Sequence, residues 1–281
     1  MRRIETVPEM LAAIDSAGLA PGSWVATDAD GTLWATDVAD QAWRLAIAER
    51  RFRARACGAM FAELEKLGER STGDVHEDAT LLYSLYAAGR ADDWAMLRAM
   101  TACWAGWREA ELRDFAARLW RERLRPRVYA TTAELLRGLI ARGYRLAVVS
   151  GSPQLLVEEA VRGLDLPGPG AVVLGACCER EGDLLSERLD HPLPWEEGKV
   201  HLLRSRIERE GVPHAIAAAF GDTFGDLALL NAAHGLRVLV HPRPALRRHA
   251  HLSADDAWVE FAPVTLVSGE PAAPPTSDRV M

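Results

Sequence analysis

The sequence predicts an α/β protein, in which a parallel sheet with helices on both faces is interrupted by an inserted block of helices. Short apolar, β-prone runs alternate with amphipathic helical stretches over the second half of the chain, a pattern typical of a parallel sheet. Between residues 37 and 125 this alternation stops, Ala, Arg, Leu and Glu dominate, and proline is absent. Apolar residues make up 49% of the 281 positions, enough for a large buried core.

Net charge and apolar runs limit the classes of partner. The formal charge of −7 argues against nucleic acid, because a phosphate backbone is bound by clusters of Lys and Arg. No run of ~18 apolar residues occurs, and the residues after Arg2 and Arg3 do not form the apolar stretch of a signal peptide. We therefore expect a soluble, cytoplasmic protein with a small-molecule partner, and neither a membrane nor a nucleic-acid partner.

Cysteine and histidine spacing excludes the common metal motifs. The four cysteines include no C-x-x-C pair and the eight histidines no H-E-x-x-H spacing, so neither a zinc site nor a thioredoxin-like site is predicted. We expect the cysteines to be reduced thiols. They are Cys57, Cys103, Cys177 and Cys178.

The first expected elements are a short amphipathic helix over Pro8–Ala17, ended by Gly18 and Pro21-Gly22, and a strand over Trp24–Asp28. The helical block follows this strand directly and ends at Pro126. Its expected helices lie within Ala39–Met60, Asp78–Ala88, Asp92–Trp104 and Glu109–Arg123.

Strands and helices then alternate. The expected helices are Thr131–Arg142, Gln154–Leu164, Lys199–Glu210 and Leu227–Ala233, and the expected strands are Tyr144–Ser150, Ala171–Cys178, Leu184–Leu189, Ala215–Phe220 and Leu236–Val240. We therefore divide the chain into a Rossmann-like core at 1–36 and 126–267 and an inserted helical cap at 37–125. The proline-rich tail at 268–281 is expected to be disordered.

Two acids follow the first expected core strand. Asp28 and Asp30 would point to the same side, and Gly31-Thr32 would turn the chain beyond the sheet edge. The two carboxylates repel each other, and a hard cation such as Mg²⁺ relieves that repulsion. A calcium loop also opens with D-x-D-G, but it needs Gly and Glu where Leu33 and Ala39 stand, which excludes it. A plain polar turn remains the alternative.

Three later positions carry further candidate residues. Ser150-Gly151 end an apolar strand, where a hydroxyl and a close backbone approach suit a phosphate, and a serine helix cap is the alternative. Lys199 follows a glycine before an amphipathic helix, where an ordinary solvated lysine is the alternative. Asp222 and Asp226, flanked by glycines, follow another strand, and a helix cap with a first-turn acid is the alternative.

The run Asp28-Ala29-Asp30-Gly31-Thr32-Leu33 closely resembles the first signature of the haloacid dehalogenase superfamily, and the three later motifs occur in that superfamily's order. The resemblance implies a hydrolase of the phosphatase type that acts through an aspartyl-phosphate. Asp28 would be the nucleophile and Asp30 the general acid and base. Ser150 and Gly151 would bind the phosphate, and Lys199 would neutralise the charge of the assembly.

The resemblance also implies Mg²⁺ as a cofactor. Asp28, the backbone carbonyl of Asp30 and Asp222 would bind the metal, and Asp226 would support these ligands from outside. A dehalogenase, which attacks carbon without a metal, lacks an acid at the position of Asp30. We therefore expect hydrolysis of a small phosphomonoester. A phosphotransferase or mutase, and a catalytically idle binding or regulatory module, remain alternatives.

The resemblance is closest to the phosphoserine-phosphatase-like branch, which has a helical cap. The stretch 241–248 is similar to its N-P-D-x-x-L-R, with His241 and Arg243 in place of Asn and Asp. Two departures argue against phosphoserine itself: Asp37 stands where the branch has a Glu for the substrate amine, and Gly225 where it has Asn. Asp37 would bind a bulkier cationic substrate, or alternatively cap the first helix of the block.

Five tryptophans in or beside the helical block allow an aromatic wall for a quaternary ammonium group such as choline. Packing inside the block is the favoured interpretation. These residues are Trp34, Trp43, Trp94, Trp104 and Trp107.

Overall fold

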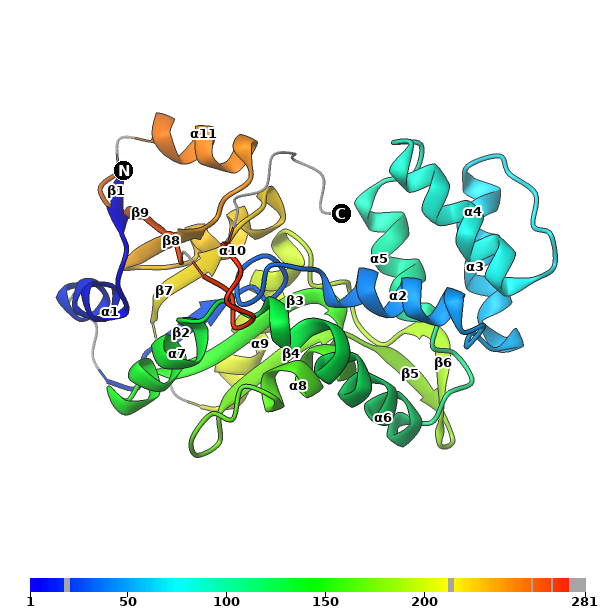
Figure 1. Ribbon diagram of the computed structural model, residues 1–281, viewed down its shortest axis with the longest axis horizontal. Coiled ribbons are helices and arrows are strands. Elements are labelled where there is room, and N and C mark those ends of the chain that lie inside the picture. The colour runs from blue at the N-terminus through cyan, green and yellow to red at the C-terminus, as the bar shows by residue number, and fades with distance from the viewer. Residues whose placement is uncertain (18–20, 212–214, 254, 264, 273–281) are drawn as a thin grey trace.

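The computed structural model describes residues 1–17, 21–211, 215–253, 255–263 and 265–272. A seven-stranded sheet forms its centre, and every pair of neighbouring strands in it is parallel (Figure 1). The strand order is β1 (Arg2–Ile4), β9 (Trp258–Phe261), β8 (Leu236–Val240), β7 (Ile216–Gly221), β2 (Trp24–Thr27), β3 (Arg145–Pro153) and β4 (Ala171–Ala176).

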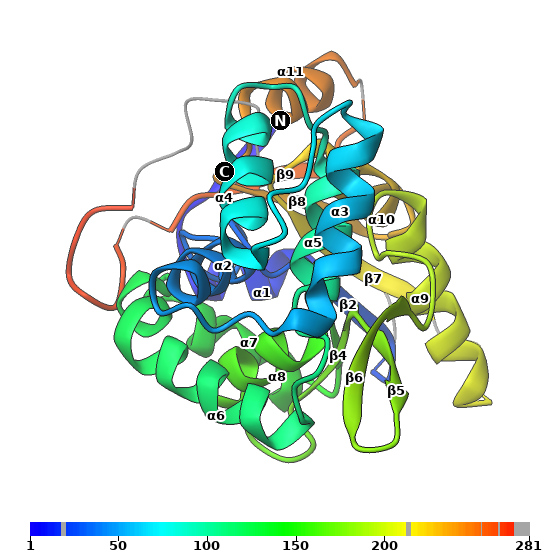
Figure 2. The same cartoon turned by 90° about the vertical axis from the view of Figure 1, so that its right-hand side faces the viewer.

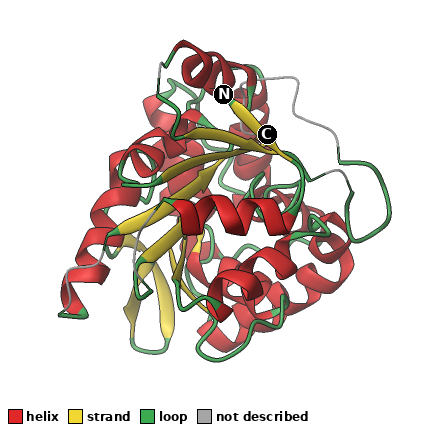
Figure 3. Ribbon diagram, turned by 90° about the vertical axis from the view of Figure 1, so that its left-hand side faces the viewer, coloured by secondary structure: helices red, strands yellow, loops and turns green. Residues whose placement is uncertain are grey.

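Two hydrophobic clusters cover opposite faces of this sheet. Alternate side chains of β2 separate them: Val25 joins one cluster, whereas Trp24 and Ala26 join the other. The first face is covered by α1 (Val7–Ser16), α7 (Thr132–Ala141) and α8 (Gln154–Arg162), and the second by α9 (Glu197–Arg209), α10 (Leu227–Asn231) and α11 (Pro244–Leu252). Figure 3 shows the sheet between these helices. The predicted parallel sheet with helices on both faces is thus confirmed.

The position of β2 determines where the site lies. It pairs with β3 on one side and β7 on the other, with Thr27 opposite Val148 and Phe220. Because parallel strands end at the same edge, the residues after Thr27, Val148 and Phe220 meet there.

The helical insertion between β2 and β3 consists of α2 (Val38–Ala48), α3 (Cys57–Lys66), α4 (Val75–Ala87), α5 (Asp93–Ala102) and α6 (Glu109–Leu119). Figure 2 shows α2 to α5 together at one end of the molecule. Aspartates start three of these helices, since the side chains of Asp37, Asp74 and Asp92 accept backbone hydrogen bonds at the N-caps. The expected helical stretch Ala39–Met60 is broken after Ala48, and Arg50 has φ of 49° in the connection.

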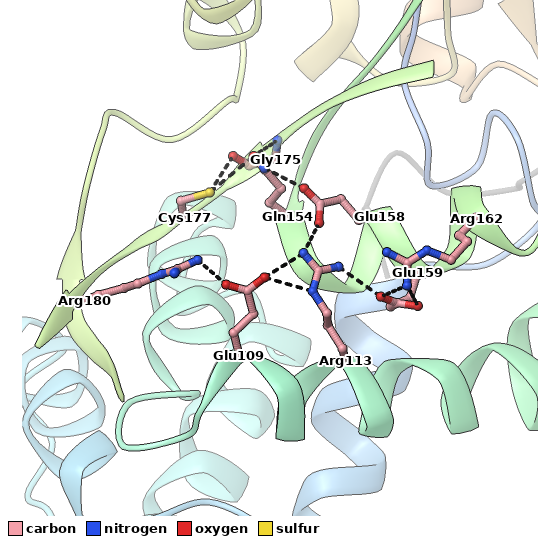
Figure 4. Close-up of polar contacts among 9 residues, drawn as sticks. All are labelled: Glu109, Arg113, Gln154, Glu158, Glu159, Arg162, Gly175, Cys177 and Arg180. Carbon is pink, nitrogen blue, oxygen red and sulfur yellow. Dashed lines mark hydrogen bonds and ion pairs between the residues drawn. The ribbon is translucent and has the colours of Figure 1, made fainter. Parts of the chain in front are cut away.

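The insertion enters and leaves the core at one place. The N–H of Ala35 donates to the carbonyl of Arg127 at 2.8 Å, and Trp34 pairs with Val128. Its last helix, α6, packs along the core helix α8, where Arg113 contacts Glu158 and Glu159 (Figure 4). Within the insertion, α2 and α5 contact β3, whereas α6 packs along α8.

A hairpin extends the insertion. Strands β5 (Cys178–Glu181) and β6 (Leu184–Leu189) pair around a turn at Gly182-Asp183. Leu185 exchanges backbone hydrogen bonds with Gly106 and Trp107, which joins the hairpin to the end of α5 and the start of α6 (Figure 2).

The sequence-based prediction treats Ala171–Cys178 as one strand and so misses β5, and it also lacks α11 and the strands β1 and β9. The two strands are only 3 and 4 residues long, and they pair with each other at the sheet edge. Of the expected tail, residues 268–272 are described, and Ser268 donates its N–H to the carbonyl of Pro126. Residues 273–281 lie outside the described residues. None of the described helices is long and apolar enough to cross a membrane.

Candidate active site

Asp28 occupies the first position after β2, and its backbone N–H donates to the carbonyl of Phe220 at 2.9 Å. The chain then turns through Gly31, whose φ of 81° favours glycine. A Cβ at Gly31 would lie 2.3 Å from Oδ2 of Asp222, so the loop after β2 and the loop after β7 approach each other too closely for a side chain. Glycine at position 31 thus brings the first and fourth motifs together.

A buried lysine connects two of the aspartates. Lys199 Nζ lies 2.5 Å from Oδ1 of Asp28 and 2.6 Å from Oδ1 of Asp226, and the lysine side chain is 1% exposed. Burial raises the pKa of Asp28 to about 7, an effect that Asp226 reinforces and Lys199 opposes. Burial alone would lower the pKa of Lys199, but Asp226 and Asp28 outweigh burial, and the pKa is raised. The ordinary solvated lysine is therefore excluded at this position.

Asp226 also organises the loop after β7. Its Oδ2 accepts hydrogen bonds from the backbone N–H groups of Asp222 at 3.1 Å and Thr223 at 2.9 Å, and from the Thr223 hydroxyl. With Oδ1 bound by Lys199, both oxygens of Asp226 already have protein partners. This geometry suits a residue that positions others.

Asp222 lies beside this group with fewer partners. Thr32 Oγ1 donates to its Oδ1 at 3.3 Å, and Arg243 Nε lies 3.7 Å from its Oδ2. Burial raises the pKa of Asp222 well above its usual range, as do Asp226 and Asp28, while Arg243 lowers it. One carboxylate oxygen from each of Asp28, Asp222 and Asp226 lies within 4.8 Å of the other two. An all-oxygen donor set of this size fits Mg²⁺.

The carboxylate of Asp30 is held from both sides. Its Oδ1 accepts from Trp34 Nε1 and from the Val38 N–H, each at 2.7 Å. Its Oδ2 accepts from the hydroxyl of Ser152 at 2.6 Å and from that of Ser150 at 3.4 Å. Burial raises the pKa of Asp30, although the hydrogen bonds from Ser152 and Trp34 counteract the shift.

The four predicted motifs are thus brought to one edge of the sheet, and the chain can be compared with known proteins. The haloacid dehalogenase-like hydrolase family matches residues 25–231, a range that includes β2 from Val25, the insertion, Lys199 and the loop after β7. The chain belongs to the haloacid dehalogenase-like hydrolases.

The individual relatives named here are 18% to 25% identical to this chain. Phosphoserine phosphatase SerB1 of Mycobacterium tuberculosis is 25% identical over 197 residues, which are 70% of this chain and 56% of that protein. The chain spans about half the length, or less, of the curated relatives it matches first. A protein of unknown function from Bordetella pertussis Tohama I has a similar fold, with TM-score 0.64 and 19% identity over 86% of this chain and 99% of that chain. A phospho-aspartyl intermediate analogue of phosphoserine phosphatase has TM-score 0.51 and 18% identity over 86% and 93% of the two chains.

Asp37, at the entrance to the insertion of this hydrolase, is the N-cap of α2. Its Oδ1 accepts the N–H of Asp40 at 2.8 Å, so the predicted helix-capping contact is present. Burial, and then the nearby Asp30, raise the pKa of Asp37 well above its usual range.

Four of the five tryptophans pack inside the protein, as the favoured interpretation predicts, so the alternative of an aromatic wall is wrong for these four. Trp34, Trp43, Trp104 and Trp107 are at most 2% exposed and belong to the hydrophobic core, because they pack the insertion and its connection to β2. Trp94 is 37% exposed.

Sequence reasoning missed the contacts of four side chains: Trp34 and Ser152, which hold Asp30, and Leu97 and Trp195, which lie against Gly151. Trp34 and Ser152 each lie close to a predicted motif residue, so their polar groups were a usable signal. Leu97 lies on α5, and no local pattern connects it to the sheet edge.

Proposed function

We propose that this haloacid dehalogenase-like hydrolase is a Mg²⁺-dependent phosphatase that hydrolyses a small phosphomonoester through a phosphoryl group carried on Asp28. The observation that supports this most directly is the buried contact of Lys199 with Asp28 beside Asp222 and Asp226. The name of the SerB1 relative agrees with phosphatase chemistry.

In the first step, a carboxylate oxygen of Asp28 would attack phosphorus while the bond between phosphorus and the leaving oxygen breaks. Lys199 binds Oδ1 of Asp28, so Oδ2 is the oxygen better placed to attack. The positive charge of Lys199 would stabilise both the ionised nucleophile and the charge on the transferred group.

Asp30 would donate a proton to the leaving oxygen, and this needs a protonated carboxyl group before the step. Its raised pKa favours that state. In the second step Asp30, now ionised, would take a proton from a water molecule that attacks phosphorus, which breaks the bond to Asp28 and releases inorganic phosphate. Trp34 and Ser152 orient the carboxyl group for both transfers.

Asp28, the backbone carbonyl of Asp30, and Asp222 would hold Mg²⁺. When bound, the metal would supply positive charge that screens the nucleophile from the phosphate. Ser150 and Gly151 would bind the phosphate oxygens. The 3.4 Å contact from the Ser150 hydroxyl to Asp30 is long, so little is lost if that hydroxyl turns to the substrate.

Turnover of p-nitrophenyl phosphate with Mg²⁺, followed by acid quench with ³²P-labelled substrate, tests the proposal. We expect phosphate release and acid-stable label on the protein that is absent from Asp28→Asn. Transfer of label to an added alcohol without phosphate release would indicate a phosphotransferase. No turnover and no labelled protein across a panel of amino-acid, sugar, choline and nucleotide phosphates would indicate a binding module.

A further inference from the structure

Trp195 is held beside the loop after β7 by hydrogen bonds of the backbone around it. The N–H of Trp195 donates to the carbonyl of Leu193 at 2.9 Å, and the N–H of Glu196 donates to the carbonyl of Gly225 at 3.1 Å. Glu196 has φ of 50°, in the left-handed region, so the chain turns sharply just after the indole. This short turn lies immediately before α9, which carries Lys199.

The indole fills the space that a side chain at position 225 would need. A Cβ at Gly225 would lie 2.5 Å from Cη2 of Trp195 and 2.6 Å from Cζ3. The Trp195 ring can therefore occupy this position only because residue 225 has no side chain. As a result, an apolar ring lies beside the fourth motif.

The same ring also approaches the second motif. A Cβ at Gly151 would lie 3.5 Å from Cε3 of Trp195 and 3.1 Å from Cδ2 of Leu97, a residue of α5. Apolar groups from the core and from the insertion thus meet at Gly151. Both side chains are half-buried, so each keeps some surface for a ligand.

Gly151 lies between the two serines that contact Oδ2 of Asp30. If Asp30 gives its proton to the leaving oxygen, the leaving group must pass next to this oxygen. Leu97 and Trp195 are apolar groups that lie against the residue between these two serines.

We propose that Leu97 and Trp195 form the apolar side of the leaving-group site, and that the substrate carries a hydrocarbon or aromatic group within a few bonds of its ester oxygen. This inference rests on the proposed phosphatase function. Burying a hydrocarbon against such a surface, where an analogue offers a hydroxyl, is expected to change kcat/KM about tenfold or more.

Butyl phosphate and 3-hydroxypropyl phosphate test the proposal, because they differ only in a terminal methyl or hydroxyl group and have similar leaving oxygens. We expect the unmodified enzyme to prefer butyl phosphate at least ~10-fold in kcat/KM. Trp195→Ala should reduce this preference to less than about threefold, mainly through a higher KM for butyl phosphate. Trp94→Ala, which removes an exposed tryptophan of α5, is the matched control and should keep the full preference.

The second variant, Leu97→Ala, should weaken the preference in the same direction, and it decides the matter if Trp195→Ala does not fold. Gly225→Ala alone should lower kcat/KM for both esters because of the clash with the ring, and the double variant Gly225→Ala/Trp195→Ala should recover activity without the preference.

Equal kcat/KM values for the two esters in the unmodified enzyme would overturn the apolar site while leaving the phosphatase intact. The same conclusion follows if Trp195→Ala and Leu97→Ala reduce both esters alike, since the two residues would then only pack the insertion on the core. If the unmodified enzyme hydrolyses neither ester nor p-nitrophenyl phosphate, the proposed function itself fails.

Discussion

Two clusters of charged side chains lie where the insertion meets the core, and they differ in burial and in charge balance. Between α6 and α8, three guanidinium groups contact three carboxylates, and we call this the Arg113 cluster (Figure 4). Its members are Glu109, Arg113, Glu158, Glu159, Arg162 and Arg180. At the edge of the sheet, four carboxylates have two cationic side chains among them. These residues are Asp28, Asp30, Asp222, Asp226, Lys199 and Arg243.

The difference explains why only one cluster is expected to bind a metal. The Arg113 side chain is 27% exposed, and the positive and negative charges of the Arg113 cluster balance each other. The site carries an excess of negative charge, and the side chains of Lys199 and Asp226 are each 1% exposed. Burial, and then the neighbouring carboxylates, raise the pKa of Asp28 and of Asp222. A buried surplus of carboxylates is stabilised by protons or by a cation, and a divalent metal meets that need.

Replacing Asp28, the proposed nucleophile, should have the largest effect on the site. Asp28→Asn keeps the shape of the side chain but removes the attacking charge, so turnover of p-nitrophenyl phosphate should fall at least ~10³-fold. Circular dichroism of the variant should match that of the unmodified protein. Near-normal turnover in a folded, Mg²⁺-bound variant would rule out Asp28 as the nucleophile.

The negative surplus predicts a dependence on metal. EDTA should abolish phosphatase activity, Mg²⁺ should restore it, and Ca²⁺ should inhibit because its larger, looser coordination disturbs in-line attack. Asp222→Asn should weaken Mg²⁺ binding at least ~10²-fold, measured by titration calorimetry, since it removes a proposed direct ligand. Full activity in EDTA would contradict the metal assignment.

Asp37→Asn should have a smaller effect that depends on the substrate. If Asp37 is the counter-ion of a cationic leaving group, its replacement should raise KM for choline phosphate roughly tenfold, the size of one charge-assisted contact. It should leave p-nitrophenyl phosphate almost unchanged, because that ester has no positive group. If Asp37 acts only as the cap of α2, both substrates should suffer alike through a loosened insertion.

The site could be predicted from the sequence wherever a strand end placed the residue. Asp28 and Asp222 each follow a strand, Ser150 lies in the last half of β3, and the pairing of β2 with β3 and β7 brings them together. Local sequence patterns did not predict the residues that pack around them. Leu97 reaches Gly151 from α5, and Trp195 depends on the missing side chain of Gly225.

The fold also contains elements that local sequence patterns predict and elements that they do not. Long alternating segments predicted most central strands and their helices. Strands β1 and β9, with 3 and 4 residues, have too few positions for a pattern, and they lack the adjacent motif that marks the equally short β2. The contacts of Arg113 likewise join residues 45 and 46 positions apart, a separation at which spacing carries no signal.

The Arg113 cluster provides the smallest expected effect on catalysis. Arg113→Gln leaves three carboxylates with two guanidinium groups, so the balance is broken in a half-buried place, and the variant should lose about 1–2 kcal/mol of folding stability. For a chain of this size that corresponds to a melting temperature lower by roughly 2–8 °C. Turnover of p-nitrophenyl phosphate should stay within about twofold of the unmodified protein's, because none of the proposed catalytic groups contacts Arg113 in the described part of the chain.

Arg108→Gln is the matched control. The side chains of its ion pair with Asp183 are 61% and 68% exposed, and loss of this pair should change stability by no more than about 0.5 kcal/mol. A loss of Mg²⁺-dependent turnover in Arg113→Gln as large as in Asp222→Asn would show that the two clusters work as one unit, and the contrast between them would fall.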